Sequence, residues 1–197
     1  MKRLFHVVTV MALSVIGSAV GQAADQASGG LGFRSNDIHA RNASELRISA
    51  PIGVRYWLSG QKVGLDLGFG VSTHKDAAAD KNTTDWSIEA GIPFRVKSWE
   101  RVHVIARPGV NYASQEDYVP GSTPGSFEKI TDKFTTFVGE IEAEVFLVEN
   151  VSVSASSGIG VVSYKPGESG AKTTTDFTTF GQNFTSVGFH VYLWGGK

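Results

Sequence analysis

Hydrophobic and polar residues alternate strictly in the stretch from Leu46 to Leu58. Every even-numbered position there is apolar, while the odd-numbered ones are mostly small, polar or charged, including Arg47 and Arg55. Successive side chains of a β-strand point to opposite faces, so the stretch predicts a strand with one apolar and one polar face. At about 3.3 Å per residue it extends roughly 43 Å. Tilted by about 40°, it still crosses the apolar band of an outer membrane, which is about 25 Å tall, so we expect it to face lipid.

The same two-residue alternation recurs along the rest of the chain. The pattern predicts eight strands, over residues 30–35, 46–58, 63–72, 86–97, 102–112, 137–147, 151–161 and 187–194. Pro51, Pro93 and Pro108 fall inside these strands, where proline removes a ladder hydrogen bond, so we expect local bulges there. The alternative for Pro108-Gly109 is a turn.

Short and long connections follow one another in strict order. Residues 59–61, 98–100 and 149–150 are short polar turns, whereas residues 36–44, 73–85, 115–133 and 166–178 are longer and rich in Ser, Thr, Asp, Lys, Gly and Pro. In an up-and-down meander, this order places the short turns at one rim and the long loops at the other. The prediction is an all-β, closed eight-stranded antiparallel transmembrane β-barrel, with its functional surface in the long loops.

The polar face of these strands carries most of the strand glycines and a set of opposite charges. Eight strands enclose a lumen just wide enough for side chains to fill, so a polar lumen needs small neighbours and paired charges. Arginine suits such buried pairing better than lysine. The alternative for these charges is a solvated outer surface on which they balance by accident. The residues expected to form a structural lumen network are Arg34, Arg47, Arg55, Asp66, Glu89, Arg95, Arg107, Glu140, Glu142 and Glu144.

The N-terminus has the pattern of an export signal. Met1-Lys2-Arg3 is basic, residues 4–20 are apolar, and small residues at positions 21 and 23 predict cleavage after Ala23. We therefore expect a signal peptide at 1–23 and a barrel domain at 24–197; the alternative is an uncleaved membrane anchor. The 197 residues carry a net charge of −1 and no cysteine. The charge gives no support for nucleic-acid binding, and the absence of cysteine excludes disulfides and thiolate metal sites.

The closing strand, Val187 to Trp194, alternates apolar residues and ends on an aromatic one. With the export signal and the loop order, it makes residues 29–194 resemble the OmpA/OmpX type of eight-stranded outer-membrane barrel. The departure is Gly195-Gly196-Lys197 after Trp194, where that family usually ends on the aromatic residue. The resemblance implies a monomer in the bacterial outer membrane. Its implied partners are outer-membrane lipids, lipopolysaccharide and the barrel-assembly machinery.

Candidate chemistry is sparse. Ser72 and His74 share one face of a strand at the outer rim, so a serine nucleophile with a histidine base for lipid deacylation is one hypothesis. The carboxylates 140, 142 and 144 offer acid–base or cation chemistry, but a structural pairing with arginine explains them more simply. His103 and His190 are expected in the lumen near the periplasmic end as hydrogen-bonded residues.

The expected function is therefore a non-enzymatic outer-membrane barrel with a lumen filled by charged pairs, no wide pore and exposed loops. No catalytic residue, cofactor or metal is predicted, because no phosphate loop, nicotinamide fingerprint or zinc spacing is present. The alternatives are a periplasmic or secreted lipocalin-like carrier of an apolar ligand, and an outer-membrane lipid-modifying enzyme.

Overall fold

The computed structural model describes residues 28–36, 52–58, 60–76, 79–123, 125–167, 171–178 and 185–194. Its strands are β1 (Ser28–Asn36), β2 (Ile52–Trp57), β3 (Gly64–Asp76), β4 (Lys81–Gly91), β5 (Phe94–Ser98), β6 (Val102–Pro120), β7 (Phe127–Val148), β8 (Val151–Lys165), β9 (Thr174–Thr178) and β10 (Thr185–Trp194). No helix in these ranges is long and apolar enough to cross a membrane. The predicted signal peptide lies outside the described residues.

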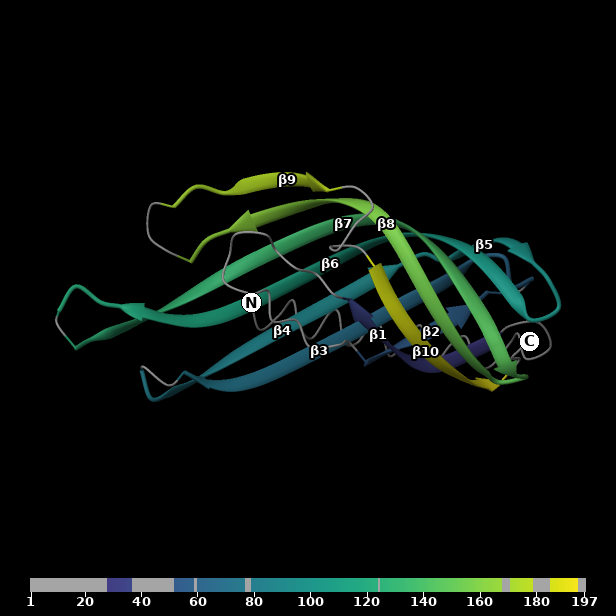
Figure 1. Ribbon diagram of the computed structural model, residues 1–197, viewed down its shortest axis with the longest axis horizontal. Coiled ribbons are helices and arrows are strands. Elements are labelled where there is room, and N and C mark those ends of the chain that lie inside the picture. Colours follow the sequence, from purple (N-terminus) through teal and green to yellow (C-terminus); the bar gives the residue numbers. More distant parts are fainter. Residues whose placement is uncertain are drawn as a thin grey trace.

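One antiparallel sheet contains all these strands and closes on itself. The order is β10-β1-β2-β3-β4-β6-β7-β8-β9, and β10 also pairs with β8, which closes the cylinder (Figure 1). β4 and β5 pair with the same strand, β6, and β9 and β10 pair with successive parts of β8. β4 and β5 therefore occupy one position in the barrel wall, and β9 and β10 occupy another. The ten strands thus fill eight strand positions around the barrel, as the alternation predicts.

The prolines disturb the barrel less than expected. Pro108 pairs with Gly139 without any register shift, so the predicted bulge at Pro108 is wrong, and Pro108-Gly109 is not a turn. Pro93 lies between β4 and β5, and the Ile92 N–H donates to the Pro108 carbonyl across this gap at 3.0 Å. The register shift lies between Arg95 and Lys97 instead. Pro51 lies outside the described residues.

Short turns lie at or within one residue of the predicted positions between β5 and β6 (99–101) and between β7 and β8 (149–150), but the long loops are largely strands. Gly60 and Gln61 have positive φ in the β2–β3 turn, and Glu149-Asn150 joins β7 to β8. β3 runs on to Asp76 and β4 starts at Lys81, while β6 and β7 pair as far as Pro120 and Phe127. The expected loops 73–85 and 115–133 are therefore hairpins that project beyond the barrel (Figure 1), and β9 occupies the end of the expected loop 166–178. The expected loop 36–44 falls outside the described residues after Asn36.

Apolar side chains point outward and charged ones inward. On β7, the side chains of Phe137 and Ile141 are 59% and 52% exposed. Glu140 and Glu142, on either side of Ile141, are only 6% and 0% exposed. The same inversion holds around the barrel, and the buried charged residues are Arg55, Asp66, Asp85, Glu89, Arg107, Glu140, Glu142 and Glu144. The polar face of the alternation is thus the lumen face.

Candidate functional site

An ion cluster occupies the middle of the lumen. It consists of two arginines from β2 and β6 and four carboxylates from β3, β4 and β7: Arg55, Asp66, Glu89, Arg107, Glu140 and Glu142. These strands place the side chains together because each residue sits at an inward position of the alternation.

Arg55 is bound along two edges of its guanidinium group. Its Nε and Nη2 atoms each donate to one oxygen of Asp66 at 2.8 Å. Its Nη1 and Nη2 atoms donate to the two oxygens of Glu142 at 2.8 and 2.9 Å. The planar fork of arginine permits two bidentate contacts at once, which the single ammonium of lysine does not.

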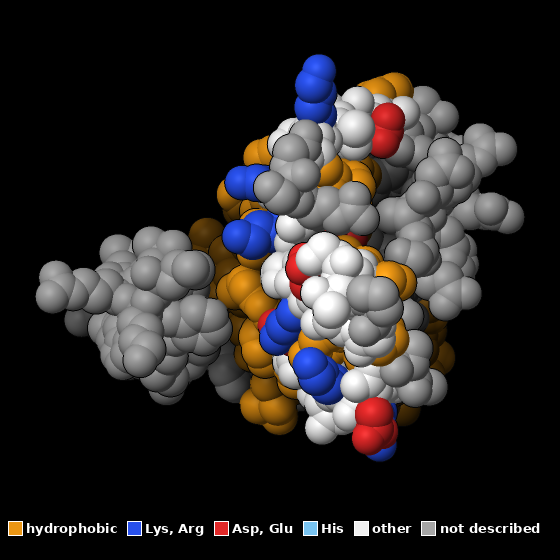
Figure 2. All heavy atoms as spheres, turned by 90° about the vertical axis from the view of Figure 1, so that its left-hand side faces the viewer, with side chains coloured by type: hydrophobic (Ala, Val, Ile, Leu, Met, Phe, Trp, Pro, Cys, Tyr) orange, Lys and Arg blue, Asp and Glu red, His pale blue; other side chains and the backbone are white. Residues whose placement is uncertain are grey.

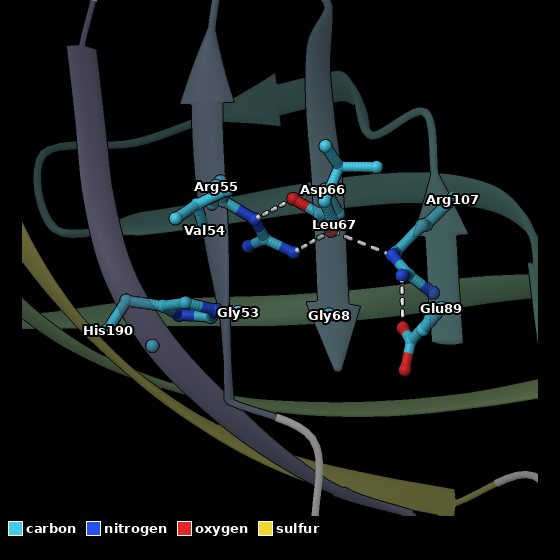
Figure 3. Close-up of a pocket in the computed structure, with 10 residues that line it drawn as sticks. Gly53, Val54, Arg55, Asp66, Leu67, Gly68, Glu89, Arg107 and His190 are labelled. Carbon is cyan, nitrogen blue, oxygen red and sulfur yellow. Dashed lines mark hydrogen bonds and ion pairs between the residues drawn. The ribbon is translucent and has the colours of Figure 1, made fainter. Parts of the chain in front are cut away.

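Arg107 connects the rest of the cluster to the same aspartate. Its Nε donates to Asp66 Oδ2 at 2.7 Å, its Nη1 to Glu140 Oε2 at 3.0 Å, and its Nη2 to Glu89. Asp66 therefore bridges the two arginines, as Figure 3 shows. One network links β2, β3, β4, β6 and β7 across the barrel.

Glycine makes room for these long side chains. A Cβ atom on Gly91 would lie 2.6 Å from Cζ of Arg107, so no larger residue fits there without moving the guanidinium group. Beside the cluster, Gly53 and Gly68 help to line a small cavity that Arg55, Arg107 and His190 also border (Figure 3). Its volume of about 30 Å³ has room for one or two water molecules.

Glu144 lies deeper in the lumen, between two histidines. Its Oε1 accepts hydrogen bonds from Ser152 Oγ at 2.6 Å and from the Tyr192 hydroxyl at 2.7 Å. His190 Nδ1 is 3.4 Å from this oxygen, and His103 Nδ1 is 3.9 Å from the other carboxylate oxygen. Both histidines are buried and face the lumen at the positions that the sequence predicts.

An aromatic layer fills the lumen on the short-turn side of the ion cluster. It consists of Trp57, Ile105, Phe146 and Tyr192, each no more than 2% exposed. The Trp57 Nε1 donates to the Tyr192 hydroxyl at 3.3 Å, and the rings of Phe146 and Tyr192 stack with centroids 5.5 Å apart. The alternation of polar and apolar residues does not predict this layer. Its signal was the exceptions to the alternation, since Trp57 and Ile105 are apolar residues at lumen positions.

The structure brings together seven of the ten residues expected in the lumen network, which are the ion cluster and Glu144. Arg95 forms no ion pair among the described residues. Its guanidinium carbon lies 4.4 Å from the ring centroid of Trp57, and its Nη1 donates to Gln61 Oε1 at 3.0 Å. The side chain of Arg34 and all of Arg47 lie outside the described residues. Among the described residues, Arg55 and Arg107 thus form ion pairs with all five expected carboxylates, which are Asp66, Glu89, Glu140, Glu142 and Glu144.

The rim pair proposed for lipid deacylation is not assembled. The Ser72 side chain forms no hydrogen bond in the described part of the chain, and His74 instead has its Nε2 2.6 Å from Thr83 Oγ1 and its Nδ1 3.7 Å from Asp85 Oδ2. Thr83 is fully buried, so its hydroxyl has no access to a lipid substrate. Among the residues described, no three His, Asp or Glu side chains are arranged to hold a metal ion.

Two solved structures match this chain at low sequence identity. A major outer membrane protein of Thermus thermophilus shares 10% identity with a TM-score of 0.49, covering 85% of this chain and 99% of its own. The attachment invasion locus protein Ail of Yersinia pestis shares 12% identity with a TM-score of 0.40, covering 84% and 93%. No family model and no curated protein matches the sequence. This chain's own strand pairing and burial establish the closed barrel with eight strand positions. This is the fold of the family that the sequence resembles.

Proposed function

We propose that the chain is an integral outer-membrane protein whose barrel is filled along its axis and whose projecting hairpins are exposed at the cell surface. The observation that carries the proposal is the inverted polarity of the barrel wall. Large apolar residues such as Ile52, Phe69 and Phe137 are 73%, 47% and 59% exposed, while charged residues are buried. In water this arrangement leaves a broad apolar surface exposed, whereas hydrocarbon solvates it.

The length of the apolar stretch fits a membrane. The outward positions of β8 between residues 151 and 161 are apolar apart from Ser157. A tilted transmembrane strand needs about 9–11 residues, which is the length of this stretch. Trp86 and Tyr112, whose ring centroids lie 5.4 Å apart, end the apolar faces of β4 and β6 toward the hairpins. Aromatic residues of this kind are typical of a membrane interface.

The filled lumen supports a structural and surface role rather than transport through a wide pore. The ion cluster and the aromatic layer lie one above the other along the barrel, and their side chains are nearly all inaccessible to solvent. The hairpins β3–β4 and β6–β7 then offer the surface for contacts outside the cell (Figure 1).

The two alternatives have less support. A carrier of an apolar ligand needs an apolar lumen, and this lumen holds paired charges. A lipid-modifying hydrolase needs an accessible nucleophile beside His74, and the hydroxyl next to its ring is buried.

Refolding tests the membrane proposal. The denatured mature chain is diluted into lipid vesicles and, in parallel, into buffer without any amphiphile, and folding is read from circular dichroism and from altered electrophoretic migration of unheated samples. We expect a folded barrel with lipid and aggregation without it. A soluble, folded monomer in plain buffer would sink the proposal.

Protease added to intact cells tests the topology. We expect cleavage in the tip of the β6–β7 hairpin, residues 121–126, and none at the turn between β7 and β8. The N-terminal sequence of the purified protein tests the predicted cleavage after Ala23.

A further inference from the structure

Two lysines stand directly opposite each other on the outer wall. Lys133 on β7 pairs with Lys165 on β8 in the antiparallel register. Both occupy outward positions, in step with Phe137 and Val161. Like charges at directly opposite cross-strand positions repel each other, so this pairing lowers stability unless an anion lies between them.

Neither lysine has a protein partner within the described ranges, although other lysines at the hairpin end do. Lys129 pairs with Glu116 at 2.7 Å, Lys75 with Asp80 at 2.5 Å, and Lys81 lies 5.2 Å from the ring centroid of Tyr118. Figure 2, which looks onto the hairpin end, shows Lys and Arg side chains at its surface beside apolar ones. The Lys133–Lys165 pair thus has positive charge that its protein neighbours do not neutralise.

The position of the pair relative to the apolar wall indicates the kind of anion. One row toward the membrane, Tyr112 pairs with Thr135, and Thr135 pairs with Ser163. One row further, Phe137 pairs with Val161, where the apolar stretch begins. The order from lysine through hydroxyl to apolar side chain matches a lipid that has a phosphate above its acyl chains.

We propose that Lys133 and Lys165 bind a phosphate group of an outer-leaflet glycolipid, with Thr135 and Ser163 as hydroxyl donors and the wall around Phe137 and Val161 in contact with its acyl chains. The inference rests on the proposed membrane location. The apolar wall directly below the lysines favours a lipid phosphate over a free phosphate, because a soluble anion gains nothing from that surface.

The test compares charge variants of the full mature barrel in lipid nanodiscs. Bis-phosphorylated lipid A is titrated in, and the adducts retained on the protein are quantified by native mass spectrometry. The double variant Lys133→Gln/Lys165→Gln is expected to bind about thirtyfold more weakly, in line with the loss of two interfacial lysines. Lys133→Arg/Lys165→Arg is expected to keep the affinity.

The matched control is Lys62→Gln/Lys97→Gln, which removes two exposed lysines at the short-turn end and is expected to bind as the wild type does. Equal adducts for the two glutamine variants would overturn the inference. Competition by excess inorganic phosphate would also overturn it, because a site that takes the soluble ion equally well is not a lipid site. A wild type that folds in bilayers but retains no lipid A refutes only this site, whereas a chain that never folds in bilayers refutes the proposed membrane function itself.

Discussion

At the level of single residues, the arginines of the ion cluster and the lysines of the hairpin end lie in different environments. Arg55 and Arg107 are 2% exposed and lie in the lumen, while the lysines of the hairpin end lie at the surface. A buried cation must be matched on every donor or its desolvation is not offset, and only the guanidinium group offers five donors in one plane. Asp66 uses both oxygens to hold two arginines, so the pairs of the cluster depend on one another.

The dependence predicts a large effect for Arg107→Ala. The substitution leaves Asp66, Glu89 and Glu140 facing one another without this guanidinium group. Breaking a buried pair of this kind costs about 3–5 kcal/mol, so the urea midpoint of the barrel in lipid vesicles should fall markedly. Arg101→Ala, at an exposed residue in the β5–β6 turn, is the control and should leave the midpoint unchanged. Similar midpoints for both variants would show that the cluster does not stabilise the fold.

Gly91→Ala probes the same contact from the backbone side. The added methyl group would sit 2.6 Å from Arg107 Cζ and push the guanidinium group off its carboxylates. We expect a loss of stability in the wild-type background and a much smaller loss in an Arg107→Ala background, measured as a double-mutant cycle in urea. An equal loss in both backgrounds would assign the cost to the glycine backbone instead.

At the level of elements, alternation predicted the strands of the barrel wall well, because the inward and outward faces of these strands differ sharply in polarity. β7 shows why, since its carboxylates 140, 142 and 144 all point inward while Ile141 and Val145 point outward. Alternation failed in the stretches 73–85 and 115–133, where Asp, Lys, Thr and Ser are typical of loops. Each of these stretches folds back on itself as a hairpin beyond the apolar wall. Its outward positions, such as Thr73, Lys75 and Thr84, are polar as well, so the contrast between the two faces disappears.

The lumen contents were only partly predictable for a related reason. Opposite charges on one face predict pairing, but the partner of each residue depends on register, which the sequence does not specify. Arg95 illustrates this, because β5 places it over Trp57 rather than beside a carboxylate. In the sequence, apolar residues of the aromatic layer are exceptions to the alternation. Only the register of the strands shows that Trp57, Phe146 and Tyr192 lie together.

Substitutions along β7 test the lipid-facing assignment of one element. Ile141→Arg places a cation at a 52% exposed position inside the apolar stretch, which should cost about 2–4 kcal/mol near the bilayer midplane. Glu128→Arg puts the same side chain on the same strand beyond that stretch and should cost little. Folding yields in lipid vesicles measure both. Equal yields would place Ile141 outside the hydrocarbon.

At the level of the whole molecule, the buried side chains in the lumen lie in two layers. The ion cluster joins β2, β3, β4, β6 and β7, and the aromatic layer adds β10 through Tyr192. Because the two layers lie at different levels along the barrel, the proposed filling of the lumen predicts that either layer still blocks it when the other is removed.

This two-layer arrangement predicts a specific conductance pattern in planar bilayers. The wild type should show no discrete steps of a wide pore, and Trp57→Ala should behave likewise, since the ion cluster still fills the lumen beyond the missing indole. Trp57→Ala combined with Arg107→Ala opens both layers and should give resolvable steps, provided that the unheated protein still migrates as a folded barrel. Large ohmic steps from the wild type would contradict a filled lumen. Steps from Trp57→Ala alone would mean that the ion cluster passes ions and that the aromatic layer forms the barrier.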